Sequence, residues 1–94
     1  MIPNWTPRAL ADITEVTEYI RIDNPTAANQ LIDQVLDVIN KTLIGQPNIG
    51  KPGRVAYTRE FVIHPSYILV YRTTGSSLDI LAFRHTAQKW PKKF

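Results

Sequence analysis

The sequence YILVYRTTGSSLDILAFRH, residues 67–85, decides the fold class of this chain. Two runs rich in β-branched, aromatic and leucine residues flank Thr74-Gly75-Ser76, and a glycine between such runs is typical of a β-hairpin turn. Upstream, His64-Pro65-Ser66-Tyr67 has a proline where a tight turn favours one, which predicts a second hairpin link. Two successive links of this kind give an antiparallel meander. We expect its three strands at about Arg59–His64, Tyr67–Thr73 and Ser77–His85.

The first half of the chain has the period of helices instead. Thr6 is followed by Pro7, and Asn24 by Pro25, and each pair predicts a capping side chain with proline at the first helical position. Apolar residues recur at helical spacing after both pairs, and Gly45 ends the second helix. The link between the helices is only about two or three residues long, which predicts an antiparallel helical hairpin.

Together these elements predict one α+β domain over residues 1–94. Ile2–Trp5 is expected to form a short N-terminal edge strand. The antiparallel helical hairpin is expected to pack on a three- to four-stranded antiparallel sheet, because helices that precede a meander must cover one of its faces. The other face of the sheet is then open to water or to a partner.

Strict alternation along Ser77–His85 sorts its side chains into two faces. Both faces are partly apolar, which suits a strand covered on both sides, by helices behind and by a bound peptide in front. A simple central strand is the alternative. The expected sets are Leu78, Ile80, Ala82 and Arg84 on one face, and Asp79, Leu81, Phe83 and His85 on the other.

Positive charge is concentrated in the second half of the chain. Residues 1–50 contain three cations and six acids, a net charge of −3, whereas residues 51–94 contain eight cations and two acids, a net charge of +6. This division indicates a negatively charged partner for the C-terminal half. The alternative is two solvated faces that differ in charge without a binding role.

Several classes of protein are disfavoured by composition. The chain has no cysteine, so it has no disulfide, thiolate metal site or cysteine nucleophile, and we expect it in a reducing cytoplasm. Its longest apolar stretch, Tyr67–Tyr71, is far shorter than the ~20 residues of a membrane span. The N-terminus has no basic region before an apolar run, so no signal peptide and no membrane association are expected.

The sequence contains no recognisable motif for binding a metal or a cofactor. His64 and His85 are far apart and have no carboxylate cluster beside them, so no metal site is predicted. No phosphate-binding glycine motif and no nucleophilic serine motif is present, and no cofactor is expected. An enzyme built from this chain would have to work with arginine, lysine, histidine and tyrosine, which are the tools of a ribonuclease.

The segment from Arg84 to Phe94 combines four cations, one histidine and two aromatic residues with no acid. Interleaved cations and aromatic rings hold phosphates and stack on bases. Docking of this segment on the chain's own sheet is the alternative. His85 is a candidate general base, although a base needs a positioned partner, and a structural or exposed histidine is the commoner case.

Four motifs follow one another along the second half of the chain: Thr58-Arg59-Glu60-Phe61, Tyr67-Ile68-Leu69-Val70-Tyr71-Arg72, Ile80-Leu81-Ala82-Phe83-Arg84-His85 and Trp90-Pro91. With these motifs the chain resembles the RelE/ParE superfamily of bacterial toxins, the toxic partners of type II toxin–antitoxin pairs. The resemblance covers nearly the whole chain and implies a compact toxin that a cognate antitoxin neutralises by wrapping a disordered segment around it.

The superfamily implies one of two activities. RelE-type members cut messenger RNA in the ribosomal A site, and ParE-type members poison DNA gyrase. The RelE branch places an arginine after the tyrosine that opens the second strand of the meander, where this chain has Ile68 after Tyr67. Related nucleases end with a His-Tyr pair or carry a basic-aromatic terminal motif, and in this chain His85 is followed by Thr86. These departures favour the ParE branch, a non-enzymatic gyrase inhibitor.

The resemblance also implies site residues. For a gyrase inhibitor, the expected target-binding residues are Arg59, Arg84, His85, Lys89 and Trp90. For a ribosome-dependent nuclease, phosphates would be bound by Lys51, Arg54 and Arg84, and His85 would move the proton. A toxin fold that only binds its antitoxin is a third reading.

Two further alternatives concern structure and docking. For Arg59 and Arg72 the alternative to target binding is a structural role, in which each pairs with Glu60, Asp79 or a helix acid and so stabilises the sheet. The antitoxin is expected on the acidic face of the helical hairpin or on the free sheet face, as a helix in a groove or as an added strand.

Overall fold

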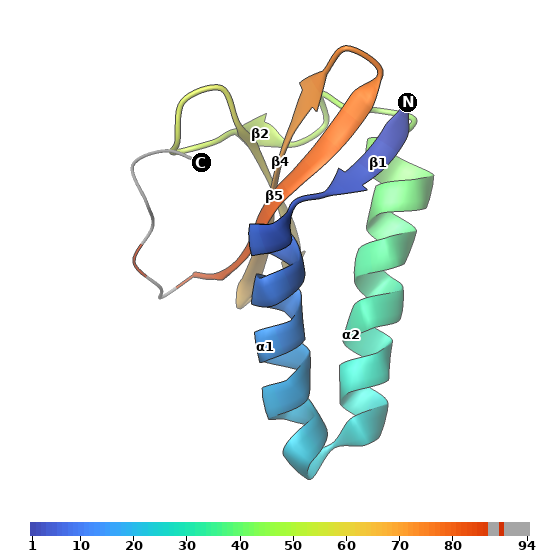
Figure 1. Ribbon diagram of the computed structural model, residues 1–94, viewed down its shortest axis with the longest axis vertical. Helices are drawn as coiled ribbons and strands as arrows, with labels where there is room; N and C mark the ends of the chain where they lie inside the picture. The colour runs from blue at the N-terminus through green and yellow to red at the C-terminus, as the bar shows by residue number, and fades with distance from the viewer. Residues whose placement is uncertain (87–88, 90–94) are drawn as a thin grey trace.

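A five-stranded sheet lies against two long helices in the computed structural model, which describes residues 1–86 and residue 89 (Figure 1). The strand order is β1-β5-β4-β3-β2, and β1 runs parallel to β5 while the other neighbours are antiparallel. The strands are β1 (Ile2–Trp5), β2 (Lys51–Pro52), β3 (Arg59–His64), β4 (Tyr67–Thr74) and β5 (Ser77–His85).

The α+β class and the three meander strands are confirmed, but the sheet is wider than predicted. The predicted N-terminal strand β1 pairs with the free edge of β5, and the two-residue β2, which was expected to be loop, pairs with the start of β3. The sheet has five strands rather than three to four, and it is mostly antiparallel because β1 alone runs parallel to its neighbour, β5. The pairing of β1 with β5 satisfies backbone hydrogen-bonding groups of β5 that would otherwise need water. No local sequence pattern predicts that this pairing is parallel.

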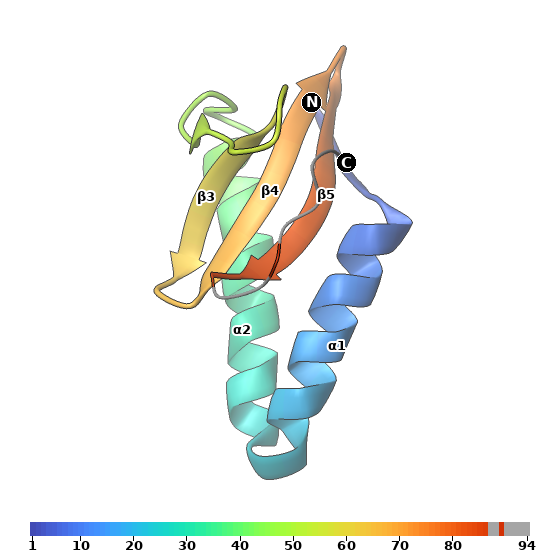
Figure 2. The ribbon, with the colours of Figure 1, turned by 90° about the vertical axis from the view of Figure 1, so that its left-hand side faces the viewer.

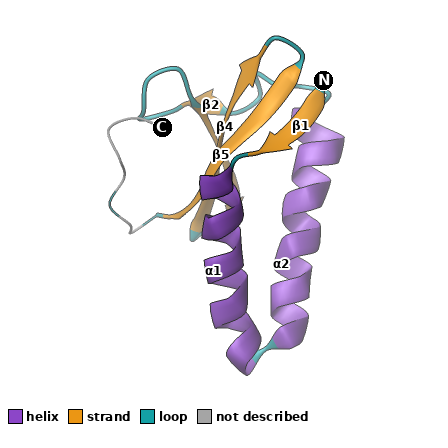
Figure 3. Ribbon diagram, viewed as in Figure 1, coloured by secondary structure: helices purple, strands orange, loops and turns teal. Residues whose placement is uncertain are grey.

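The helical hairpin forms where its caps predict it. Helix α1 (Pro7–Asp23) begins after Thr6, whose hydroxyl accepts a hydrogen bond from the Ala9 amide at 3.3 Å. Helix α2 (Pro25–Asp37) begins after Asn24, whose side-chain oxygen accepts from the Ala27 amide at 3.0 Å. Because Asn24 alone joins the helices, they run antiparallel and their shared tip extends beyond the sheet (Figures 2 and 3). A wider helical turn, η1 (Val38–Leu43), continues α2.

One core fills the space between the helices and the sheet. It takes an apolar stripe from each helix, and the sheet supplies alternate side chains of β3, β4 and β5. Each such buried side chain contributes roughly 1.5–3 kcal/mol to stability. The buried members are Ala9, Leu31, Val35, Ile39, Leu43, Ile63, Leu69, Tyr71, Leu78, Ile80 and Phe83.

A β-bulge in β5 changes which side chains face the helices. Val70 pairs with Ala82 and Tyr71 pairs with Ile80, so Leu81 is an extra residue without a partner on β4. Beyond the bulge, Phe83 joins Ile80 in the core, while Leu81 and Ala82 lie in a second apolar cluster. The expected face assignment holds through Leu81 and is wrong from Ala82 onward, because strict alternation cannot anticipate an inserted residue.

The second apolar cluster occupies the sheet face away from the helices. Its members Ile68, Val70, Leu81 and Ala82 are all buried. Glu60 pairs with Val70 and so lies on this same face, where it is 2% exposed. The part of this face next to Glu60 is therefore not the open surface that the sequence predicted.

Candidate target-binding surface

The predicted cationic residues form two groups at opposite ends of the sheet. Arg59 pairs with Tyr71 and His85 pairs with Tyr67, so they lie on opposite sides of β4 and are offset along it by four residue steps, roughly 13 Å at about 3.3 Å per residue. We call Lys51, Arg54 and Arg59 the loop end, and Arg84, His85 and Lys89 the helix end. Trp90, also predicted, lies outside the described residues.

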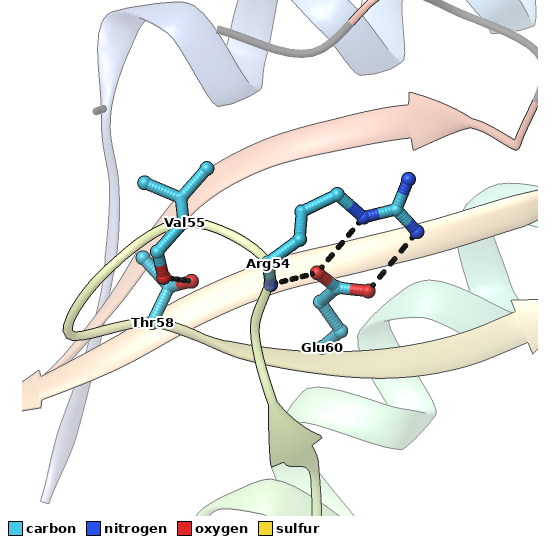
Figure 4. Close-up of polar contacts among 4 residues, drawn as sticks. All are labelled: Arg54, Val55, Thr58 and Glu60. Carbon is cyan, nitrogen blue, oxygen red and sulfur yellow. Dashed lines mark hydrogen bonds and ion pairs between the residues drawn. The ribbon is translucent and has the colours of Figure 1, made fainter. Parts of the chain in front are cut away.

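At the loop end, Arg54 is bound to the buried carboxylate of Glu60 (Figure 4). Glu60 accepts from the Arg54 backbone amide at 2.7 Å and from its Nε and Nη2 groups at 3.2 and 3.3 Å. Only 1% of the Glu60 side chain is exposed, so its charge depends on this pairing. Arg54 therefore closes the loop over residues 53–58, and its predicted role in binding phosphate is weakened.

Arg59 is anchored to the preceding loop. Its Nη1 group donates to the carbonyl of Gly50 at 2.8 Å and to that of Asn48 at 3.3 Å. Tyr71 holds the same loop, because its hydroxyl accepts from the Gly50 amide at 3.0 Å and donates to the Pro47 carbonyl at 2.8 Å. Burial raises the pKa of the Tyr71 hydroxyl and keeps it a donor.

The alternative prediction that Arg59 and Arg72 pair with nearby acids holds for Arg72 but not for Arg59. Arg59 binds backbone carbonyls rather than Glu60. Arg72 does lie near Asp79, with 4.0 Å between Nε and Oδ2. The pKa of the Asp79 carboxyl lies below its usual value, chiefly because the Ser77 hydroxyl donates to it and also because the Asn4 amide does.

A cleft of about 350 Å³ opens between Arg59 and Arg72. This volume lies in the range of small-ligand sites. The sequence prediction included Arg59 but not Tyr57, and it gave Arg72 only a pairing role. The lining residues are Pro52, Gly53, Tyr57, Thr58, Arg59, Arg72 and Thr73.

Tyr57 has an unusual backbone and an exposed ring. Its φ is +65°, a left-handed conformation that costs a residue with a Cβ about 1–2 kcal/mol, and it is 92% exposed. The surrounding loop is tight: the Gly53 amide donates to the Thr58 carbonyl at 2.7 Å, and the Thr58 hydroxyl to the Val55 carbonyl at 2.7 Å (Figure 4). A Cβ at Gly53 would overlap the Thr58 hydroxyl. No sequence pattern marks a tyrosine for this conformation.

At the helix end, Arg84 is paired with an acid of α1. Its Nη1 lies 3.8 Å from Asp12 Oδ1, its Nη2 donates to the Lys89 carbonyl at 2.6 Å, and only 14% of its side chain is exposed. Asp12 Oδ2 also accepts from the Phe83 amide at 3.0 Å. Asp12 thus joins α1 to the edge of β5 beyond β1, and it neutralises much of the charge that Arg84 would offer to a target.

His85 lies in an aromatic and acidic environment. Tyr67 stacks on Phe83 with 5.2 Å between ring centroids, and His85 meets Tyr67 edge-on at 5.4 Å. These rings line a cavity of about 360 Å³ together with α1. Because α1 contributes Asp12 and Glu15 to that cavity, the neighbours of His85 include carboxylates, which repel phosphates. The structure does not bring His85 together with Lys51 and Arg54.

Within residues 1–86 and 89, no group of histidine, cysteine or acidic side chains is placed to hold a metal ion. The same residues contain no helix that combines the length and the apolar character needed to cross a membrane.

The family match and the curated relatives identify the chain as a toxin of the RelE/ParE superfamily, and the helical hairpin on a sheet is the fold of solved members. Residues 4–90 match the family model described as the ParE toxin of the type II toxin-antitoxin system parDE. The chain therefore belongs to the ParE toxin family, and this membership implies a cognate antitoxin as its partner.

Three curated relatives agree with this assignment. The chain is 36% identical to the putative toxin Y4kP of Sinorhizobium fredii, over 94% of this chain and 91% of the relative. It is 33% identical to toxin RelE2 of Caulobacter vibrioides, over 89% and 93% of the two chains. It is 30% identical to toxin ParE2 of Mycobacterium tuberculosis, over 79% and 70%.

Two solved structures share the fold. A chain of the chromosomal ParDE system from P. aeruginosa superimposes with a TM-score of 0.71 at 19% identity, covering 90% of this chain and 95% of that one. A YoeB/ParE toxin from Agrobacterium tumefaciens gives a TM-score of 0.65 at 20% identity, covering 90% and 98%.

Proposed function

We propose that this chain is a ParE-like toxin that inhibits DNA gyrase, and so blocks replication, until a cognate antitoxin neutralises it. The observation that carries the proposal is the match of residues 4–90 to the ParE toxin family. In this proposal the toxin acts by binding rather than by catalysis.

The geometry of the predicted nuclease residues supports a binding role. A ribonuclease needs a base and phosphate-binding cations around one scissile bond. Here Arg59 is separated from His85 by about half the length of β4, on the opposite side of that strand, and Arg54 is held by Glu60. Ile68, at the position where the RelE branch has an arginine, is 4% exposed and belongs to an apolar cluster.

A RelE-like messenger endonuclease is the second candidate. It is favoured by the 33% identity to a protein named toxin RelE2, over nearly all of both chains. Lys51 and Arg59 remain at one end of the sheet as cations for a messenger backbone.

Two assays with the purified toxin decide between these activities. Gyrase supercoiling of a relaxed plasmid is expected to fall with toxin concentration, while messages on translating ribosomes stay intact. Cleavage of messages at fixed codon positions, with supercoiling unaffected, would contradict the gyrase proposal. His85→Ala is the matched variant: a nuclease loses cleavage and keeps antitoxin binding.

We propose that the antitoxin occupies the apolar groove between the two helices. This groove has a volume of about 260 Å³ and is lined mainly by apolar side chains of β1, α1 and α2, including Trp5, Ile13 and Val35. Leu10 and Leu36 also line it and are 51% and 42% exposed, so a partner helix would remove apolar surface from water. Leu10→Asp is expected to weaken the toxin–antitoxin complex, whereas Ile22→Asp, on an 80% exposed residue near the tip of the hairpin, is the matched control.

A further inference from the structure

The cavity at the helix end differs in character from the rest of this basic chain. It has a volume of about 360 Å³, and neither lysine nor arginine is among the described residues that line it. We propose that it binds the guanidinium group of an arginine side chain that the antitoxin supplies. We call it the aromatic cavity, and its lining residues are Asp12, Glu15, Val16, Tyr19, Tyr67, Phe83 and His85.

Helix α1 contributes two carboxylates to one wall of the aromatic cavity. The lining residues of α1 recur at helical spacing, so they share one face of this helix. Asp12 is held in place, because it accepts from the Phe83 amide at 3.0 Å and lies 3.8 Å from Arg84 Nη1. Glu15, one turn further along, has no hydrogen bond or ion pair within residues 1–86 and 89. The charge of Glu15 is therefore available to a cationic ligand.

The sheet contributes three rings to the opposite wall. Tyr67 pairs with His85 across β4 and β5, and Phe83 lies on the same face of the sheet, towards the helices. The planes of Tyr67 and Phe83 are 14° apart with 5.2 Å between centroids, and Phe83 is only 1% exposed. This packing fixes the orientation of the half-buried Tyr67 ring. A fixed aromatic face attracts a cation through the negative side of its quadrupole.

Flat rings opposite a carboxylate favour a guanidinium over other cations. A guanidinium stacks on an aromatic face and donates two parallel hydrogen bonds from its edge to a carboxylate. A lysine ammonium is more strongly hydrated and has no plane to stack. Among the described residues no group of side chains is placed to hold a metal ion. An arginine side chain is therefore the cation that matches both walls.

The surroundings of the aromatic cavity favour an arginine within a polypeptide over a free small cation. Tyr19 is 78% exposed, so its ring offers apolar surface to the residues next to that arginine. Leu10 and Ile13, on the other side of the same helix, line the groove that we assign to the antitoxin. A helix is about 10 Å wide, so a few residues of extended chain cross it. The inference rests on the antitoxin as partner, but it concerns a separate surface.

The first test follows the backbone amide signals of isotope-labelled toxin by NMR during titration with N-acetyl-arginine methylamide. The citrulline analogue has the same shape without the charge, and the lysine analogue has the charge without the plane. Glu15→Gln removes the charge at nearly constant size. Glu18→Gln is the matched control, because Glu18 lies on α1 outside the cavity, in an exposed pair with Arg21.

We expect the arginine probe to shift the signals of the cavity residues, the lysine probe to bind more weakly and the citrulline probe to cause no shift. Glu15→Gln should weaken binding of the arginine probe about three- to tenfold, and Glu18→Gln less than twofold. Tyr67→Leu should weaken it about two- to thirtyfold through loss of the cation–π contact, with thermal unfolding as the check that this variant is folded.

The second test measures the affinity of the toxin variants for the purified cognate antitoxin by calorimetry. Glu15→Gln should weaken the complex about three- to tenfold, whereas Glu18→Gln should leave it within about twofold of the parent. This test connects the cavity to the antitoxin, and the NMR titration establishes its ligand chemistry.

Three results would overturn the proposal. One is an arginine probe that causes no shifts at the cavity, or none beyond those of the citrulline probe. Another is an equal loss from Glu15→Gln and Glu18→Gln. The third is an antitoxin affinity that Glu15→Gln leaves unchanged. Neither test involves gyrase, and a complex that Glu15→Gln weakens but Leu10→Asp does not would contradict the groove proposal alone.

Discussion

At the loop end of the sheet, arginines bind the chain's own backbone and one buried acid, whereas at the helix end Arg84 meets a carboxylate from the opposing helix. Both ends contribute to the same net charge of +6. At the loop end an open cleft is lined by residues that include Arg59 and Arg72, whose side chains the register puts on opposite faces of the sheet, whereas the helix end is balanced by Asp12 and Glu15. Formal charge therefore overstates the cationic surface at the helix end, and the loop end is the better place for an anion.

The largest expected effect concerns the buried carboxylate at the loop end. Glu60→Ala leaves the Arg54 amide without its acceptor and opens the loop, and we expect a loss of about 3 kcal/mol in the free energy of unfolding by urea. Glu18→Ala, which breaks an exposed pair with Arg21, is the control and should cost less than about 1 kcal/mol. Equal costs would mean that the Arg54–Glu60 pair does not hold the loop.

A smaller effect is expected at the helix end. Asp12→Ala removes the acceptor of the Phe83 amide and the carboxylate that lies beside Arg84, which should cost about 1–2 kcal/mol. Asp12→Asn keeps an acceptor but removes the charge, so chemical denaturation of the two variants separates the hydrogen bond from the ion pair. If both variants match the parent, α1 is held to β5 by apolar packing alone.

A gain in stability is expected at Tyr57. Because glycine adopts a positive φ without strain and the exposed ring contributes little burial, Tyr57→Gly should raise the unfolding free energy by about 0.5–1 kcal/mol. Thermal unfolding of the variant and the parent measures this difference. A destabilised variant would show that the ring supports the fold.

The smallest effect is the pH dependence contributed by Asp79. Its folded-state pKa is lowered, so its contribution is fully present above the unfolded value near 3.8 and is lost as the pH falls through the folded value. The stability difference between the parent and Asp79→Asn should therefore shrink as the pH is lowered from 7 towards 2. A difference that stays constant over this range would contradict the pairing with Ser77 and Asn4.

The helical hairpin and the meander were predictable because their signals are local. Thr6 and Asn24 cap the helices through hydrogen bonds to amides three residues away. Turn residues likewise place the strand ends within a few positions. The candidate site was less predictable, since Arg54, Arg59 and Arg84 look alike in a sequence and differ only in what lies beside them.

The sequence by itself determined the order of the elements, the caps, the turns and the charge difference between the halves, because each depends on residues close together in the chain. The tertiary structure alone decided the parallel pairing of β1 with β5, the bulge at Leu81, the partners of each arginine and the left-handed conformation of Tyr57. These features depend on groups brought together from distant parts of the chain, or on loop closure that no single residue specifies.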